Sequence, residues 1–202
     1  PASPNSTARS RALALALIFG LLMVRDQKGV IRSERNFYGV LSIKKQPYGK
    51  SLQLHTLYNG DILHGSQFFG EGSSQYEPTT YYTAESGIGQ AFSAHPNRAS
   101  GLRVGAIGLG VGTVAAYCGP RDYFRFYEIN PAVIRIAQTE FSYLSNCQGH
   151  IEIQEGDARI ELSKELRRGQ RQNFDLLIVD AFTDDSIPVH LLTKEAFEIY
   201  IS

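Results

Sequence analysis

Apolar and polar residues alternate in the first third of the chain, a pattern typical of β-strands with one buried face. The pattern predicts three short strands, at residues 37–43, 51–58 and 62–69. The sequence NGD at residues 59–61 is a strong turn signal between the last two. We therefore expect a small antiparallel β-meander, within a β domain spanning residues 31–80.

From residue 85 onward, short apolar runs alternate with helical patterns. The predicted strands are 102–107, 123–128, 151–154 and 174–179, and the predicted helices are 86–94, 113–118, 130–144, 158–167 and a last one from 193. Repeated strand–helix units predict an α/β fold in which helices cover both faces of a parallel sheet through right-handed crossovers. We expect this Rossmann-like domain to span residues 81–202. Because such sheets normally have further strands, we also expect it to be truncated at its C-terminus.

The N-terminal region contains the apolar run ALALALIFGLLMV at residues 12–24, between basic residues. A helix of this length spans roughly 20 Å, less than the ~30 Å of a hydrocarbon core. A signal-peptide core, the end of a membrane helix and a buried element all remain open. We expect residues 1–30 to be a membrane-proximal or linker segment. The expected location is the cytoplasm, either free or attached to the inner membrane.

Charge and cysteine content narrow the function classes. The 20 basic and 20 acidic residues cancel, so bulk charge gives no attraction to nucleic acid. Cys118 and Cys147 form no CxxC pair and have no histidine partner nearby, so we expect no metal site. We favour two buried, reduced thiols, although a single disulfide remains open.

A glycine-rich turn, GLGVG at residues 108–112, lies between a buried strand and a helix. Gly108, Gly110 and Gly112 suit a tight turn, and a Cβ there would keep a ligand away from the backbone. A purely structural turn gives the same pattern. However, Glu128 ends the next strand about 20 residues later, where a carboxylate can hold the hydroxyls of a ribose.

Two more acids follow the next two predicted strands. Asp157 comes after the third strand, and Asp180 ends the fourth. The carboxyl ends of parallel strands form the edge at which open α/β sheets bind ligands. Asp157 also fits a helix cap, which is the alternative for that residue. Taken together, the glycine turn and the three acids predict a nucleoside-cofactor site.

The segments that carry these residues resemble the cofactor-binding and active-site strands of the spermidine synthases. They are RVGAIGLGVGT, FRFYEINPAVI, IEIQEGDAR and NFDLLIVDAF. Upstream, ILHGSQF is similar to that family's LDGxxQ segment, and TTYYTAES stands in place of its DExxYHE segment. The resemblance covers about residues 36–201. It implies a β domain leading into a fold like that of the class I S-adenosylmethionine-dependent methyltransferases.

The resemblance also implies residue roles. It implies that the cofactor is S-adenosylmethionine or decarboxylated S-adenosylmethionine. The implied contacts are Gly108, Gly110 and Gly112 at the amino-acid end, Glu128 at the ribose, Asp157 and Ala158 at the adenine, and Gln67 near the tail. Asp180 stands in place of the catalytic aspartate.

Three departures from the family pattern change the expected chemistry. Val111 replaces an aspartate in the glycine loop, the histidine of the YHE sequence is missing, and residues 180–188 replace the DSSDPxGP loop. The sequence DAFTDDSIPVHLLT is similar to a divergent bacterial branch whose domains are attached to membrane segments. This agrees with the apolar run near the N-terminus.

The expected mechanism needs a nucleophile and a proton acceptor. A sulfonium leaves as a neutral thioether, whereas an alkylammonium with a pKa near 10.4 must first lose a proton. Asp180 can orient an amine and accept its proton, and Tyr81 or Tyr82 can align it. Asp184 and Asp185 either attract a cationic amine or form a solvated loop. We expect His64 and His190 to be structural histidines with satisfied hydrogen bonds.

These observations predict an aminopropyl transferase that acts on a small-molecule amine. Methyl transfer from S-adenosylmethionine, a non-catalytic cofactor-binding module of a membrane protein and, more distantly, an NAD-dependent oxidoreductase remain alternatives. We expect no nucleic-acid partner, and we leave open a homodimer and a membrane tether.

Overall fold

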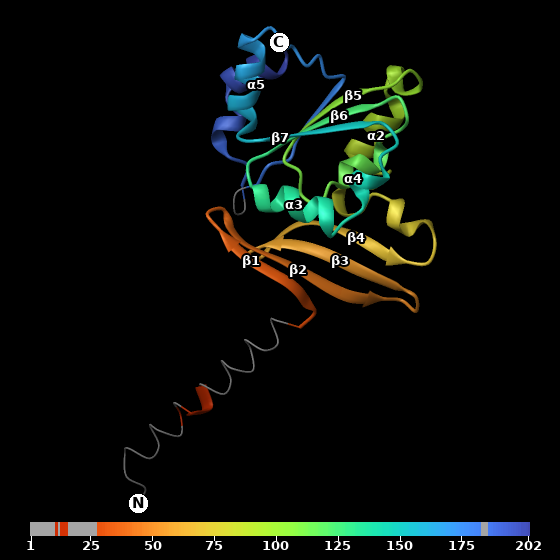
Figure 1. Cartoon of the computed structure of the whole chain (residues 1–202), viewed down its shortest axis with the longest axis vertical. Helices are drawn as coiled ribbons and strands as arrows, with labels where there is room; N and C mark the ends of the chain where they lie inside the picture. The colour runs from red at the N-terminus through yellow and green to blue at the C-terminus, as the bar shows by residue number, and fades with distance from the viewer. Residues whose placement is uncertain (1–10, 12, 16–27, 183–185) are drawn as a thin grey trace, which may run out of the picture.

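The computed structural model describes residues 11, 13–15, 28–182 and 186–202 of the chain. Figure 1 shows two stacked β-sheets, an antiparallel one (orange to yellow) beneath a parallel one, with helices α3 and α4 between them. In the described ranges, no helix is both long and apolar enough to cross a bilayer. Most of the apolar run at residues 12–24 lies outside the described residues.

The antiparallel sheet has the strand order β1-β2-β3-β4. Its strands are β1 (Val30–Asn36), β2 (Gly39–Tyr48), β3 (Leu52–Asn59) and β4 (Ile62–Gly70). The prediction of three strands was wrong by one, because β1 (VIRSERN) is mostly polar and has little apolar pattern. Ion pairs to α3 and its C-terminal end hold this edge strand instead. Arg32 pairs with Glu140 at 2.5 Å, and Glu34 pairs with Arg135.

The parallel sheet has the order β7-β6-β5-β8. Its strands are β5 (Arg103–Ile107), β6 (Tyr123–Glu128), β7 (His150–Glu155) and β8 (Leu176–Val179). Strand β6, which follows β5 in the chain, pairs with β5 on one side, and β8 pairs with β5 on the other side. This reversal of strand order opens a crevice at the carboxyl ends of β5 and its neighbours.

Helices cover both faces of the parallel sheet, as the sequence predicts. The α-helices are α2 (Gly87–Ala94), α3 (Pro131–Thr139), α4 (Tyr143–Asn146), α5 (Ala158–Arg167) and α6 (Lys194–Tyr200). The 3-10 helices are η1 (Ser73–Tyr76), η2 (Thr80–Tyr82), η3 (Pro96–Ala99), η4 (Thr113–Tyr117) and η5 (Val189–Leu191). The side chains of Ser86, Asn130, Asp157 and Thr193 accept backbone hydrogen bonds at the starts of α2, α3, α5 and α6.

Two predicted helices differ from the structure. The helix expected at 113–118 is the 3-10 helix η4, and the one expected at 130–144 is divided into α3 and α4. The break brings Phe141 into the core and allows the backbone N–H of Ser142 to donate to Gln67 Oε1 at 2.8 Å. Tertiary contacts therefore override the local helical pattern here.

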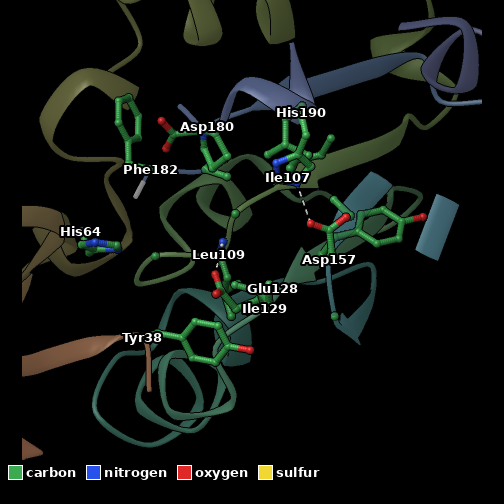
Figure 2. A pocket seen from close by; sticks show the side chains of 18 of the residues that line it. Tyr38, His64, Ile107, Leu109, Glu128, Ile129, Asp157, Asp180, Phe182 and His190 are labelled. Atoms are coloured by element: carbon green, nitrogen blue, oxygen red, sulfur yellow. Dashed lines mark hydrogen bonds and ion pairs between the residues drawn. The ribbon is translucent and has the colours of Figure 1, made fainter. Parts of the chain in front are cut away.

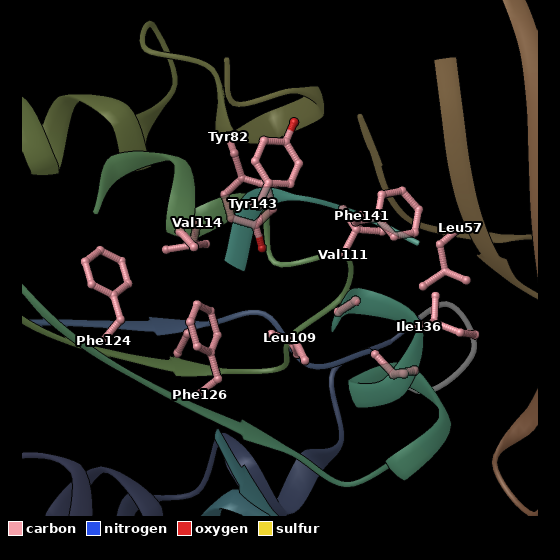
Figure 3. Packing of buried hydrophobic residues seen from close by; sticks show 14 of the residues in the cluster. Leu57, Tyr82, Leu109, Val111, Val114, Phe124, Phe126, Ile136, Phe141 and Tyr143 are labelled. Carbon is pink, nitrogen blue, oxygen red and sulfur yellow. The ribbon is translucent and has the colours of Figure 1, made fainter. Parts of the chain in front are cut away.

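The larger core fills the space between the two sheets (Figure 3). Leu41, Ile43 and Leu57 enter it from the antiparallel sheet, and Phe124 and Phe126 enter it from β6. A smaller core on the opposite face of the parallel sheet contains Ile107, Tyr127, Ala158, Leu162 and Leu191. Because the first core draws on both sheets, they pack as one body.

Cys118 and Cys147 form a disulfide, with 5.1 Å between their Cα atoms. The expectation of two reduced thiols was therefore wrong. The bridge joins the residue that follows η4 to the residue that follows α4. The sequence showed no pairing signal, because the two cysteines are 29 residues apart and meet only through packing of η4 on α4.

Candidate cofactor and active site

A cavity of about 250 Å³ lies at the carboxyl ends of the four parallel strands. Its lining includes the glycine loop after β5, Glu128 at the end of β6, Asp157 after β7 and Asp180 after β8. Figure 2 shows Asp157 and His190 on one side of the cavity, Glu128 near its middle, and Asp180, Phe182 and His64 on the other side. The three acids expected at one sheet edge therefore share one cavity.

The glycine loop threads between two neighbouring backbone segments. At Gly108, where φ is +97°, an added Cβ would lie 2.3 Å from the carbonyl oxygen of Asp180. At Gly110, where φ is +55°, it would lie 2.4 Å from the carbonyl oxygen of His64. Both glycines line the cavity, so only glycine lets this loop form its wall. Gly112 is not among the lining residues, and its neighbour is the Leu144 side chain.

Glu128 is held by the loop it faces. Its Oε2 accepts a hydrogen bond from the N–H of Leu109 at 3.0 Å, and its Oε1 accepts one from the N–H of Asn130 at 2.9 Å. Burial raises the pKa of the Glu128 carboxyl, and these backbone hydrogen bonds partly offset that rise. Each carboxylate oxygen has a second acceptor site, so Glu128 can also accept hydrogen bonds from a pair of ligand hydroxyls.

Asp157 caps α5, the alternative that the sequence offered, and it also forms part of the cavity wall. Its Oδ1 accepts from the N–H of Ile160 at 3.0 Å at the start of α5, and its Oδ2 lies 2.7 Å from Nε2 of His190. Ala158, the first residue of α5, also lines the cavity. The first N–H groups of a helix have no intrahelical partner, so this end of the cavity suits a ligand with acceptor atoms.

Two tyrosines from η2 hold Asp180. The hydroxyl of Tyr81 donates to Asp180 Oδ2 at 3.0 Å, and the hydroxyl of Tyr82 donates to the same oxygen. Among the described residues no donor reaches Oδ1, so that oxygen is available to a ligand. Burial raises the pKa of Asp180, whereas the two hydroxyls lower it. Tyr81 lines the cavity, whereas Tyr82 is buried outside the lining and contacts it only through the hydrogen bond to Asp180.

Gln67, expected near the cofactor tail, lies outside the cavity lining. It is fully buried, and its Nε2 donates to the carbonyl of Gln75 at 2.8 Å and to the hydroxyl of Ser142 at 2.7 Å. It therefore ties β4 to η1 and to the segment that follows α3. Asp184, expected to attract the substrate, lies outside the described residues.

Two histidines that the sequence interpretation did not assign to the site line the cavity. His190 has the satisfied hydrogen bond expected of a structural histidine, to Asp157, and it also lines the cavity. His64 also lines the cavity, burial lowers its pKa, and no described residue forms a hydrogen bond with its ring. The available signal was position, because His64 directly precedes Gly65 in ILHGSQF and His190 lies in the segment after Asp180.

Val111 lies at the centre of the glycine loop and belongs to the larger hydrophobic core. Its side chain is buried, and its Cγ2 would lie 2.6 Å from a Cβ added at Gly65. The residue thus packs the glycine loop against β4. No group of histidine, cysteine, aspartate or glutamate residues in the described chain is arranged to hold a metal ion.

Comparison with known proteins identifies relatives of this arrangement. No protein-family model matches the chain. Over 96 residues the chain is 32% identical to the polyamine aminopropyltransferase of Vibrio vulnificus (strain CMCP6), and the match covers 46% of this chain and 31% of that protein.

Two solved structures share the fold. Spermidine synthase from Thermotoga maritima aligns with a TM-score of 0.55 at 18% identity, over 85% of this chain and 52% of that one. A probable spermidine synthase from Corynebacterium glutamicum ATCC 13032 aligns with a TM-score of 0.54 at 20% identity, over 86% of this chain and 58% of that one. The chain thus spans about half of each. The predicted α/β fold is confirmed, and so is the resemblance to the spermidine synthases.

Proposed function

We propose that this chain, which is spermidine synthase-like in sequence and fold, transfers an aminopropyl group from decarboxylated S-adenosylmethionine to a small amine. The observation that carries the proposal is the cavity itself. It brings together a glycine loop and one carboxylate from the end of each of three parallel strands. The sequence match to an aminopropyltransferase supports the same activity.

The order of groups along the cavity suits a nucleoside with a charged tail. Asp157 and Ala158 would hold the adenine, Glu128 the ribose hydroxyls, and the loop at Gly108 and Gly110 the tail. When bound, the sulfonium supplies an activated carbon and a neutral thioether leaving group. These contacts would direct that carbon toward the side of the cavity where Asp180 lies.

The charge of the lining favours cationic ligands. Glu128, Asp157 and Asp180 line the described part of the cavity, and no lysine or arginine does. A decarboxylated cofactor tail and an alkylammonium are both cations, so they match this lining. The carboxylate of S-adenosylmethionine and the diphosphate of NAD would find no cationic side chain there.

Asp180 would prepare the amine for attack. An alkylammonium has no lone pair, so it must lose a proton before it can act as a nucleophile. Tyr81 and Tyr82 fix Oδ2, which leaves Oδ1 to orient the amine and accept that proton. Burial raises the pKa of Asp180 and so makes its carboxylate a stronger base.

Calorimetry of the full chain with decarboxylated S-adenosylmethionine, S-adenosylmethionine and NAD tests which cofactor binds. Mass spectrometry with a panel of diamines tests whether an aminopropyl group is transferred.

Asp180→Asn should lower turnover by roughly 10²- to 10⁴-fold, the usual contribution of a placed general base, with little change in cofactor affinity. Glu128→Ala should weaken cofactor binding by about 1–3 kcal/mol.

Glu155→Ala is the matched control for Glu128→Ala. Glu155 pairs with Glu128 in the strand register, yet it is exposed and outside the cavity lining. The Glu155→Ala variant should leave cofactor binding unchanged.

Near-normal turnover in Asp180→Asn would show that another group accepts the proton. Tighter binding of S-adenosylmethionine, with methyl transfer, would make methylation the activity, and binding without turnover on any amine would favour the non-catalytic module.

A further inference from the structure

His190 reaches the Asp157 end of the cavity from a segment remote from Asp157 in sequence. It lies in η5, which follows β8, whereas Asp157 caps α5, which follows β7. Nevertheless His190 Nε2 and Asp157 Oδ2 are 2.7 Å apart, and both residues line the cavity (Figure 2). Because a carboxylate can only accept, the imidazole donates in this contact.

The contact fixes both oxygens of Asp157. Oδ1 is held by the N–H of Ile160 at the helix start, and Oδ2 is held by His190. Since a carboxylate oxygen has two acceptor sites, Oδ2 can receive a second donor from the cavity while His190 remains in place. The carboxylate therefore presents an acceptor of fixed position to any ligand at this end.

The backbone of His190 is anchored on both sides. Its carbonyl accepts a hydrogen bond from Arg159 Nη1 at 2.9 Å, and the next residue, Leu191, is buried in the smaller core. Arg159 lies two residues after Asp157, so the start of α5 holds both the backbone carbonyl and the imidazole of His190. A loosely placed surface histidine would lack such anchors.

We propose that His190 is a positioning residue for base recognition, which holds the Asp157 carboxylate so that it accepts a hydrogen bond from an exocyclic amino group. This inference rests on the proposed nucleoside site. Adenine carries such a 6-amino donor, whereas hypoxanthine carries a 6-oxo acceptor that a carboxylate repels. His190 would thus sharpen selection of adenosine-type over inosine-type ligands without itself touching the reacting atoms.

Two substitutions separate the hydrogen bond from the bulk of the side chain. His190→Gln keeps an N–H donor, while His190→Leu keeps a side chain of similar reach without a donor. His150→Leu is a matched control, because His150 also contacts a carboxylate, Glu152 at 3.3 Å, but lies at the opposite end of β7 from Asp157. Calorimetry of the full chain with 5′-methylthioadenosine and 5′-methylthioinosine gives the affinity ratio.

In His190→Leu the preference for methylthioadenosine over methylthioinosine should fall about tenfold, the loss expected for one hydrogen bond to a charged group. His190→Gln should retain most of the preference, and His150→Leu should retain all of it. An equal loss for both nucleosides in His190→Leu, or no loss for either, overturns the inference while the proposed function stands. If the unsubstituted chain binds neither nucleoside, the proposed function itself fails, and the inference fails with it.

Discussion

Each carboxylate in the cavity is fixed by contacts within the protein before any ligand arrives. Backbone N–H groups hold Glu128, a helix start and an imidazole hold Asp157, and two phenols hold Asp180. Charged groups fixed in this way need little reorganisation when a ligand binds, which is how preorganised sites stabilise developing charge. The residue types were visible in the sequence, but the partners that fix them were not.

The Tyr82→Phe substitution tests how the phenols tune Asp180. Both hydroxyls lower the pKa of Asp180 against the rise caused by burial, so removing one should raise that pKa further. The base works when deprotonated, and its activity is lost as pH falls through its pKa. The acid limb of the kcat–pH profile should therefore move to higher pH in Tyr82→Phe.

Tyr143→Phe is the control for this shift. Its hydroxyl is also lost from the interior, where it donates to the carbonyl of Glu77 at 2.9 Å, but it does not contact Asp180. Both variants should lose some stability, and only Tyr82→Phe should move the limb. A limb that stays in place, or moves equally in both variants, would contradict a tuning role for Tyr82.

At the scale of elements, local signals predicted what local physics controls. The caps at Asn130, Asp157 and Thr193 act within a few residues, so the helix starts could be predicted from the sequence. Strand β1 could not, because its ion pair from Arg32 goes to Glu140, 108 residues away. The break after α3 was also missed, since it depends on a hydrogen bond from Ser142 to Gln67, which lies in β4 of the antiparallel sheet.

The disulfide gives a prediction at the same scale, because it ties η4 to α4 beside the glycine loop. Closing a loop between residues 29 apart should stabilise the fold by about 3–4 kcal/mol in the chain-entropy treatment. A Cys118→Ser/Cys147→Ser variant should therefore unfold at lower denaturant concentration than the unsubstituted chain kept free of reductant. Thiol titration of the unfolded, unreduced chain should find no free thiol. Two titratable thiols, with equal stabilities, would show that the bridge does not form.

Across the whole molecule, the cavity draws on both sheets. His64 lies in β4 and Tyr38 in the turn between β1 and β2, while the carboxylates lie at or just after the ends of the parallel strands. The sequence predicted the contribution of the parallel sheet, because glycine loops and acids at strand ends recur in such folds. It could not predict which meander residues would face the cavity, since that depends on how the two sheets pack. The sequence accordingly did not assign His64 to the cavity that it lines, and it did not show that Gln67 is buried outside the cavity lining.

Truncating the N-terminus tests whether residues 1–27 are part of the folded body. The first described contact of the β-sheet region is the hydrogen bond from the N–H of Lys45 to the carbonyl of Gly29, at 2.7 Å, and Leu13 and Leu15 are exposed. Deleting residues 1–27 should therefore change Tm by less than about 3 °C, the shift that roughly 1 kcal/mol produces in a domain of this size.

Deleting residues 1–36 is the contrasting variant, because it also removes β1 and the ion pairs of Arg32 and Glu34 to Glu140 and Arg135. It should lower Tm clearly, while the shorter deletion should keep both a cooperative melt and stabilisation by methylthioadenosine. If residues 1–30 are a membrane-proximal segment, one of the two expected forms, the full chain should also sediment with lipid vesicles and the 1–27 deletion should not. A non-cooperative melt after the shorter deletion would contradict this prediction. It would mean that the apolar run buries its side chains against the sheets and so contributes to the core.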